Sequence, residues 1–265
     1  MFTKSAGQWR AREIPPDEIV LFRRRVRETK IGPVVAQNSY LINLAAADPE
    51  LRTRSIGALR EELDRAETLG LDGLVMHPGS FTSGTEAGGL RLIAEGLSEI
   101  FESRPEAKTR VLLEHTAGQG TNLGHRFEHL AEIIDGLGGS PRVGVCLDTC
   151  HLLAAGYDIV SEDGYHETFH QFGRLVGFSR LKAFHLNDSK KPCGSRVDRH
   201  EHIGKGCLGL EPFRRIVNDP RFARLPMLLE TPKLDTPQSR RLSDVDPFDR
   251  TNLERLRKLI RIPHP

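Results

Sequence analysis

Short apolar runs alternate along the chain with longer stretches in which apolar residues recur at helical spacing. The short runs show little polar alternation, which is typical of parallel strands covered by helices. They predict seven strands, at residues 1–3, 33–36, 71–76, 110–113, 142–147, 181–184 and 225–229, of which the first is only a fragment. The longer stretches predict helices at residues 16–27, 49–69, 87–102, 123–135, 162–176, 211–217 and 246–260.

Repeated strand-then-helix units predict an α/β fold, either a TIM (β/α) barrel or a doubly wound parallel sheet. No glycine-rich phosphate loop of the GxGxxG or GxxxxGKS type follows a strand. No linker rich in proline, glycine or serine divides the chain, so we expect one domain over residues 1–265. The polar stretch at 231–247, which contains Pro232 and Pro237, predicts a surface loop.

Five of the seven predicted strands are closed by a residue type that binds divalent metals. These residues are His77, Glu114, Asp148, His185 and Glu230. A single polar residue at a strand end is common, whereas five of this kind favour one shared site. The C-terminal ends of parallel barrel strands meet at one face, where active sites lie. The pattern therefore predicts a metal site at that face.

Two further pairs enlarge the cluster. Asp148 and His151 are three residues apart at the end of a predicted strand, and Asp198 and His200 are two residues apart in a loop. The eight candidate ligands are His77, Glu114, Asp148, His151, His185, Asp198, His200 and Glu230. One zinc ion needs roughly four ligands, so eight predict a multinuclear site with a bridging carboxylate. Imidazole and carboxylate without thiolate favour zinc, with manganese or iron as alternatives.

Composition limits the class of protein. The chain has 265 residues, with 38 Lys+Arg, 36 Asp+Glu and a net charge of +2, which excludes a disordered chain and a uniformly basic DNA coat. No apolar run approaches the roughly 18 residues of a membrane span. The N-terminus lacks the apolar core of a signal peptide. We therefore expect no membrane partner and a cytoplasmic location, where the four cysteines stay reduced.

Basic residues near the predicted cluster fit a polyanionic substrate. Metal ions that share a site can hydrolyse phosphoesters, because they lower the pKa of bound water and neutralise the charge on phosphate. The basic residues that could hold a polyanion are Lys182, Lys190, Lys191, Arg196, Arg199 and Lys205.

Several ordered motifs between about Phe2 and Thr231 match one known family. They include Gln8-Trp-Arg10, Asn38-Ser-Tyr-Leu-Ile-Asn-Leu44, His77-Pro-Gly-Ser80, Glu114-His-Thr-Ala-Gly-Gln-Gly120, Val143-Gly-Val-Cys-Leu-Asp-Thr-Cys-His151, His185-Leu-Asn-Asp188, Gly194-Ser-Arg-Val-Asp-Arg-His200 and Leu229-Glu-Thr231. With these motifs the chain resembles the endonuclease IV family of apurinic/apyrimidinic DNA repair enzymes.

The resemblance implies a TIM barrel with three zinc ions at its C-terminal face. It also implies base excision repair, with cleavage on the 5′ side of an abasic site in duplex DNA and removal of blocking groups from 3′ ends. By the same resemblance, Glu114 bridges two zinc ions and is the catalytic carboxylate. Asp148, His185 and Glu230 complete one position, His77 serves the other, and His151, Asp198 and His200 hold the third.

Residues outside the metal cluster also receive roles from the resemblance. It implies that Tyr40 and Leu41 press into the DNA at the lesion, and we add Arg199 as a candidate for DNA binding. The partner that the resemblance implies is thus duplex DNA with an abasic site, bound by a monomer. An abasic site lacks stacking, so bent and flipped-out DNA costs less there than in intact duplex.

The chain departs from the family pattern in three places. Gln37 stands where the family has a histidine ligand, which implies a weaker position beside His77. The family's first strand and helix have no counterpart, so we expect a TIM barrel that lacks its first βα unit. The loop before Trp9 carries the small residues Ser5-Ala6-Gly7 instead of longer polar ones, which implies a reduced grip on DNA.

Two other functions stay open on the sequence alone. One is a degenerate relative that binds damaged DNA without cutting it, because Gln37 weakens one metal position. The other is a metal-dependent sugar isomerase or epimerase, since such enzymes place histidines and carboxylates around metals on the same barrel.

Overall fold

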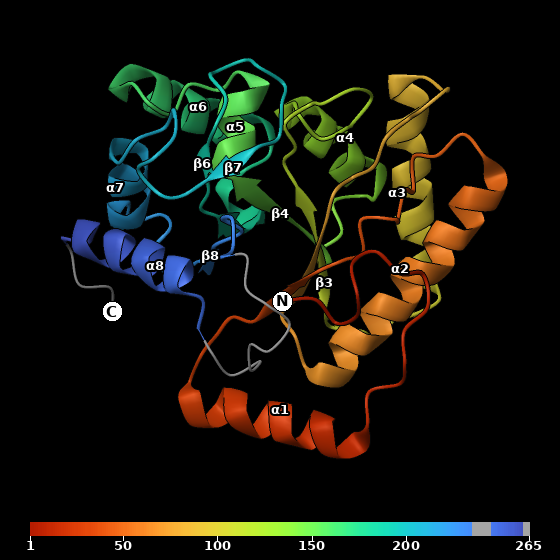
Figure 1. Ribbon diagram of the computed structural model, residues 1–265. Helices are drawn as coiled ribbons and strands as arrows, with labels where there is room; N and C mark the ends of the chain where they lie inside the picture. Colours follow the sequence, from red (N-terminus) through yellow and green to blue (C-terminus); the bar gives the residue numbers. More distant parts are fainter. Residues whose placement is uncertain (235–244, 262–265) are drawn as a thin grey trace.

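Six parallel strands form the central sheet of the computed structural model, which describes residues 1–234 and 245–261 (Figure 1). Their order in the sheet follows their order in the chain. The strands are β1 (Val35–Gln37), β2 (Gly73–Met76), β3 (Arg110–Glu114), β4 (Val143–Asp148), β5 (Leu181–His185) and β8 (Met227–Leu228). A separate antiparallel pair, β6 (Asp188–Ser189) and β7 (His200–Glu201), follows β5.

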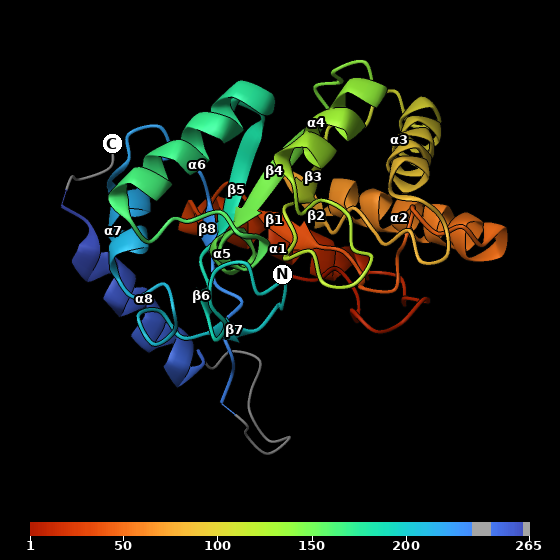
Figure 2. The same ribbon diagram turned by 90° about the horizontal axis from the view of Figure 1, so that it is seen from above.

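Most helices connect successive strands and cover the outer side of the sheet as an arc (Figure 2). The first helix precedes β1, the last follows β8, and the short one after β4 lies at the C-terminal ends of the strands. The helices are α1 (Pro16–Thr29), α2 (Pro49–Leu69), α3 (Glu86–Glu102), α4 (Phe127–Gly136), α5 (Thr149–Ala155), α6 (Glu162–Leu175), the 3₁₀ turn η1 (Phe178–Arg180), α7 (Glu211–Asn218) and α8 (Pro247–Leu259). This strand and helix alternation is the α/β barrel pattern that the apolar runs predict.

Local sequence sets the helix ends. The Asp48 side chain caps α2 by accepting a hydrogen bond from the backbone N–H of Glu50, and Pro49 occupies the first turn, where no partner for an N–H is lost. Gly70 closes the same helix with φ of 75°, a left-handed conformation that favours glycine. Thr85 caps α3 in the same manner as Asp48, through the N–H of Gly88.

Two apolar layers lie on opposite faces of the sheet. The larger one packs the strands against the helices and includes Leu74, Leu113 and Leu147. The smaller one lies on the inner face, and its members are Val35, Val75, Leu112, Cys146 and Ala183. Side chains alternate between the faces of a strand, so the residues two positions further along point to the inner face as well.

The sheet stays open, since β1 and β8 are its two edges in the described part of the chain. At the β1 edge, Phe2 forms a parallel bridge with Gln37, and the Gln37 N–H donates to the Met1 carbonyl oxygen at 2.7 Å. The fragment predicted at residues 1–3 is thus a single bridge. The incomplete TIM barrel that the sequence predicts is confirmed.

The structure corrects two predicted elements. Helix α4 begins at Phe127 instead of residue 123, because Gly124 has φ of 89° and Leu123 donates its N–H to the Gly79 carbonyl. Helix α5 was not predicted, since its seven residues are too few for a periodic apolar pattern. Most of the predicted loop at 231–247 lies outside the described residues.

Within residues 1–234 and 245–261, no helix combines the length and the apolarity needed to cross a membrane.

Replacing Phe222 by alanine tests the larger apolar layer. Phe222 is 1% exposed and its ring contacts Phe184 and Phe169, so Phe222→Ala should lower the free energy of unfolding by about 3–5 kcal/mol. Urea denaturation followed by circular dichroism measures this value. Val20→Ala, at a side chain that is 65% exposed on α1, should change it by less than about 0.5 kcal/mol. Equal effects for the two variants would contradict the packing described here.

Candidate metal centre

The eight predicted ligands lie together at the C-terminal ends of the strands. His77 directly follows β2, Glu114, Asp148 and His185 close β3, β4 and β5, and Glu230 lies two residues after β8. The others are His151 in α5, His200 in β7, and Asp198 just before β7. Their ligand atoms form three overlapping groups: His77, Glu114 and His151; Glu114, Asp148, His185 and Glu230; and Asp148, His151 and His200, with Asp198 paired to both imidazoles of the last group.

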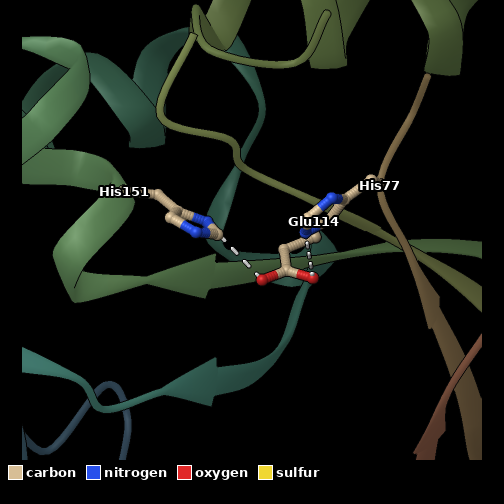
Figure 3. Close-up of side chains that lie close together, drawn as sticks. All are labelled: His77, Glu114 and His151. Atoms are coloured by element: carbon tan, nitrogen blue, oxygen red, sulfur yellow. Dashed lines mark ion pairs between the residues drawn. The ribbon is translucent and has the colours of Figure 1, made fainter. Parts of the chain in front are cut away.

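Glu114 stands at the centre of the cluster, and its carboxylate is fully buried. One oxygen, Oε1, is 3.0 Å from His185 Nδ1, while the other, Oε2, is 3.2 Å from His77 Nε2. Figure 3 shows the carboxylate between the rings of His77 and His151, with its two oxygens directed to opposite sides. Glu114 therefore presents one oxygen to each of two neighbouring groups, as a bridging carboxylate does.

The second group joins the ends of four strands, because Glu114 belongs to it as well. His185 Nδ1 lies 3.0 Å from Glu230 Oε2 and 4.0 Å from Asp148 Oδ2. Asn187 fixes both carboxylate-bearing segments: its Nδ2 donates to Asp148 Oδ2 at 2.6 Å, and its Oδ1 accepts from the Glu230 N–H at 2.8 Å. Sequence reasoning gave Asn187 no role, although its place in the His185-Leu-Asn-Asp188 motif was a signal.

The third group directs two imidazole nitrogens at one carboxylate. Asp198 Oδ2 is 3.1 Å from His151 Nε2, and Asp198 Oδ1 is 3.2 Å from His200 Nε2. The other nitrogens are occupied, because His151 Nδ1 pairs with the His115 carbonyl at 2.8 Å and His200 Nδ1 with the Glu230 carbonyl at 3.2 Å. Such second-sphere bonds set the tautomer and aim the free nitrogen at a metal.

The occupied Nδ1 atom of His151 also decides whether this imidazole belongs with His77 and Glu114 or with Asp198 and His200. This atom lies 3.5 Å from Glu114 Oε1, which places His151 near His77 as well as near Asp198. Because Nδ1 is held by a backbone carbonyl, only Nε2 is free, and it faces Asp198. Gln37 also reaches the His77 and Glu114 pair, because its Nε2 donates to Glu114 Oε2 at 2.9 Å.

The ionisation of the cluster shows a demand for positive charge. Burial alone would raise the pKa of Glu114, but the positive charges of His185 and His77 hold it well below its usual range. Burial alone would lower the pKa of His151, yet Asp148 and Asp198 raise it to about 10. Against the same burial effect, Asp148 and Asp198 raise the pKa of His200 to about 9. Carboxylates and imidazoles that stabilise charge in this way fit divalent cations, which supply it permanently.

Two other groups of ligand-type residues differ from this cluster. Glu86, His125 and His129 approach one another, but the Arg126 guanidinium occupies that place: its Nε donates to His129 Nε2 at 2.9 Å and it pairs with Glu86. Cys150 lies beside Asp198 and His200 and is buried. Burial, followed by the charge of Asp148, raises the pKa of the Cys150 thiol far above its usual range, so it stays protonated.

The three predicted DNA-contacting residues lie at the rim of the cluster. Tyr40 is 61% exposed, and its ring centroid is 6.2 Å from that of His77. Leu41, half-buried, follows in the same turn. Arg199 is exposed between Asp198 and His200, and its guanidinium donates to the Asp198 carbonyl at 2.6 Å. An aromatic ring and a cation therefore flank the cluster on accessible surface.

Comparison with known proteins identifies relatives of this chain. The family model for xylose isomerase-like TIM barrels matches residues 1–259. A protein named probable endonuclease 4 from Citrifermentans bemidjiense is 48% identical over 98% of this chain and 89% of its own length.

Solved structures give the same result. Endonuclease IV from Thermus thermophilus superposes with a TM-score of 0.82 at 35% identity, covering 97% of this chain and 87% of that one. A D-tagatose 3-epimerase-like protein reaches a TM-score of 0.67 at 19% identity, which shows a shared fold alone. With nearly half of its residues identical to a relative along almost its whole length, the chain belongs to the endonuclease IV family.

Proposed function

We propose that this chain is a zinc-dependent endonuclease of base excision repair. It cleaves the phosphodiester bond on the 5′ side of an abasic site in duplex DNA, leaves a 3′-hydroxyl, and trims blocked 3′ ends. The observation that carries the proposal is the cluster of eight imidazoles and carboxylates at the strand ends, in a chain of this family. Eight ligands are more than the chemistry of a sugar epimerase on this barrel needs.

Three metal positions follow from the occupied and free donor atoms. Glu114, Asp148, His185 and Glu230 form the first, and all four approach within ligand distance of one another. His151, Asp198 and His200 form a second position, in which the two imidazoles share the Asp198 carboxylate. The third combines His77 with the Oε2 side of Glu114. Mixed imidazole and carboxylate donors suit zinc, and manganese is an alternative.

When bound, zinc supplies a water molecule of lowered pKa and neutralises charge on the phosphate. The side chains of this chain prepare the site for that chemistry. Glu114 stays ionised at neutral pH, because His185 and His77 hold its pKa low, so its carboxylate can accept a hydrogen bond from a water molecule and orient it. Asn187 links the Asp148 carboxylate to the backbone N–H of Glu230 and so holds these two segments together.

The rim residues supply recognition of the lesion. The exposed Tyr40 ring can stack where a base is missing, and Leu41 adds apolar surface beside it. Arg199 offers a guanidinium to a backbone phosphate. Since an abasic site lacks its own stacking, DNA bends there at lower cost, and the rim favours that deformed duplex.

The proposed setting is a monomer in the cytoplasm. The four cysteines are free, which matches a compartment that keeps thiols reduced.

Incubation with a defined duplex tests the proposed activity. Zinc-loaded protein should nick a duplex that carries one abasic site, on the 5′ side of that site, and should leave the matched undamaged duplex intact. Denaturing gel electrophoresis of end-labelled strands measures both products. Binding without any nick would support the degenerate DNA binder, and turnover of a free ketose or aldose without nicking would support an epimerase.

Asp198→Asn tests the shared carboxylate of the second position. A neutral amide cannot balance the cation that His151 and His200 face, so the variant should lose about one zinc equivalent per chain and most of its nicking activity. Mass spectrometry of metal content after desalting gives the count. Asp135→Asn, at an exposed carboxylate on α4, is the matched control and should keep the full metal content. A full metal content in Asp198→Asn would contradict the assignment.

Substitutions at Tyr40 separate stacking from hydrogen bonding. Tyr40→Ala should weaken binding of the abasic duplex by about 1–3 kcal/mol, the range for one aromatic stacking contact. Tyr40→Phe keeps the ring and should bind within about twofold of the original protein. Fluorescence anisotropy with labelled abasic duplex measures both. Equal losses in the two variants would show that the hydroxyl, not the ring, makes the contact.

A further inference from the structure

Gln37 occupies the end of β1 at the edge of the metal cluster. Its side chain points to the inner face of the sheet, two residues after Val35 of the inner apolar layer. Gln37 and His77 converge on the same atom, because Gln37 Nε2 lies 2.9 Å and His77 Nε2 lies 3.2 Å from Glu114 Oε2. The amide is therefore a member of the His77 position by geometry.

The other end of this amide has no partner. Gln37 is 5% exposed, and its Oε1 atom makes no hydrogen bond in the described part of the chain. A buried acceptor without a partner costs about 1–3 kcal/mol, so such an atom calls for an explanation. A neutral amide oxygen is an acceptable ligand for a divalent cation, and a half-turn of the terminal amide exchanges Oε1 with Nε2.

The three positions differ in their donors. The Asp198 position has two imidazoles and a carboxylate, and the Glu230 position has one imidazole and three carboxylates. The His77 position has one imidazole, one oxygen of the shared Glu114 carboxylate, and Gln37. Of these three donor sets, the His77 position alone includes a neutral amide, which is a weaker zinc ligand than imidazole and a donor type that manganese also accepts.

We propose that Gln37 sets the metal affinity of the His77 position: its Oε1 serves as a ligand there, the position holds its ion more weakly than the other two, and it stays open to manganese when those two hold zinc. The inference rests on the proposed function, since it concerns one of the three positions assigned above. The unpartnered Oε1 atom is the observation that carries it.

The hydrogen bond from Gln37 to Glu114 gives the weakness a physical cause. An ion that enters the position competes with the amide N–H for Glu114 Oε2, and it must reverse the amide before Oε1 can reach it. Glu114 Oε1 instead receives His185 Nδ1 at 3.0 Å, and this imidazole is itself a ligand of the Glu230 position, so it does not compete with the ion there. The two oxygens of one carboxylate thus serve two positions of different affinity.

Metal counts on full-length protein test the proposal without using activity. After zinc loading and desalting, the original protein should retain about two zinc equivalents, and Gln37→His, which offers an imidazole, should retain about three. Manganese added to the two-zinc protein should bind as about one further equivalent, seen by loss of the free-ion signal in electron paramagnetic resonance. Gln171→His on α6 adds a histidine far from the cluster and should match the original protein.

Gln37→Leu keeps a side chain of similar size and removes the ligand oxygen. It should retain about two zinc equivalents but bind no further manganese, and circular dichroism with thermal melting checks that each variant is folded. Equal zinc retention in the original protein and folded Gln37→His would overturn the proposal. So would undiminished manganese binding in Gln37→Leu, which serves alone if Gln37→His does not fold. Metal counts as expected, together with no nicking of abasic duplex, would contradict the proposed activity and leave the role of Gln37 in place.

Discussion

Side-chain alternation on parallel strands is the constraint on which the whole site depends. Val75, Leu112, Cys146 and Ala183 fill the inner face of the sheet, and the ligand-type residue of each strand follows two positions later. Because side chains two residues apart on a strand share a face, burying the apolar residue on the inner face also places the ligand on that face, nearer the C-terminal end of the strand. A slip of one residue in any strand would turn its ligand outward, toward the helices.

The sequence predicts this layer well, because it depends on strand ends alone. It predicts the pairs across loops less completely. Nothing in the apolar pattern shows that the carbonyl of His115 receives the Nδ1 atom of His151, since backbone partners leave no residue signature. The start of α4 was misplaced for a similar reason: the left-handed Gly124 interrupts a run that reads as helical. Ligand-type side chains at strand ends can be predicted from the sequence, whereas contacts made by backbone atoms are known only once the fold is known.

Electrostatics joins the site into one unit. Glu114 shares its carboxylate between His77 and His185, and Asp198 shares another between His151 and His200. Each carboxylate lowers the cost of burying positive charge at the imidazoles, and each imidazole keeps its carboxylate ionised. Buried charges of this kind are tolerated only as a set, because removal of one partner leaves the other without compensation. The apolar inner layer below excludes water and strengthens all of these interactions.

Asn187 compensates for the shortest strand of the sheet. β8 has only two residues in its ladder with β5, so backbone pairing alone holds Glu230 loosely. The amide of Asn187 grips the Glu230 backbone with its oxygen and the Asp148 carboxylate with its nitrogen. Changes in the sequence of the connection before β8 can then leave the spacing between the Asp148 carboxylate and the Glu230 backbone intact. Position 187 itself tolerates little change, because a replacement side chain must both donate and accept a hydrogen bond at the place of the Asn187 amide.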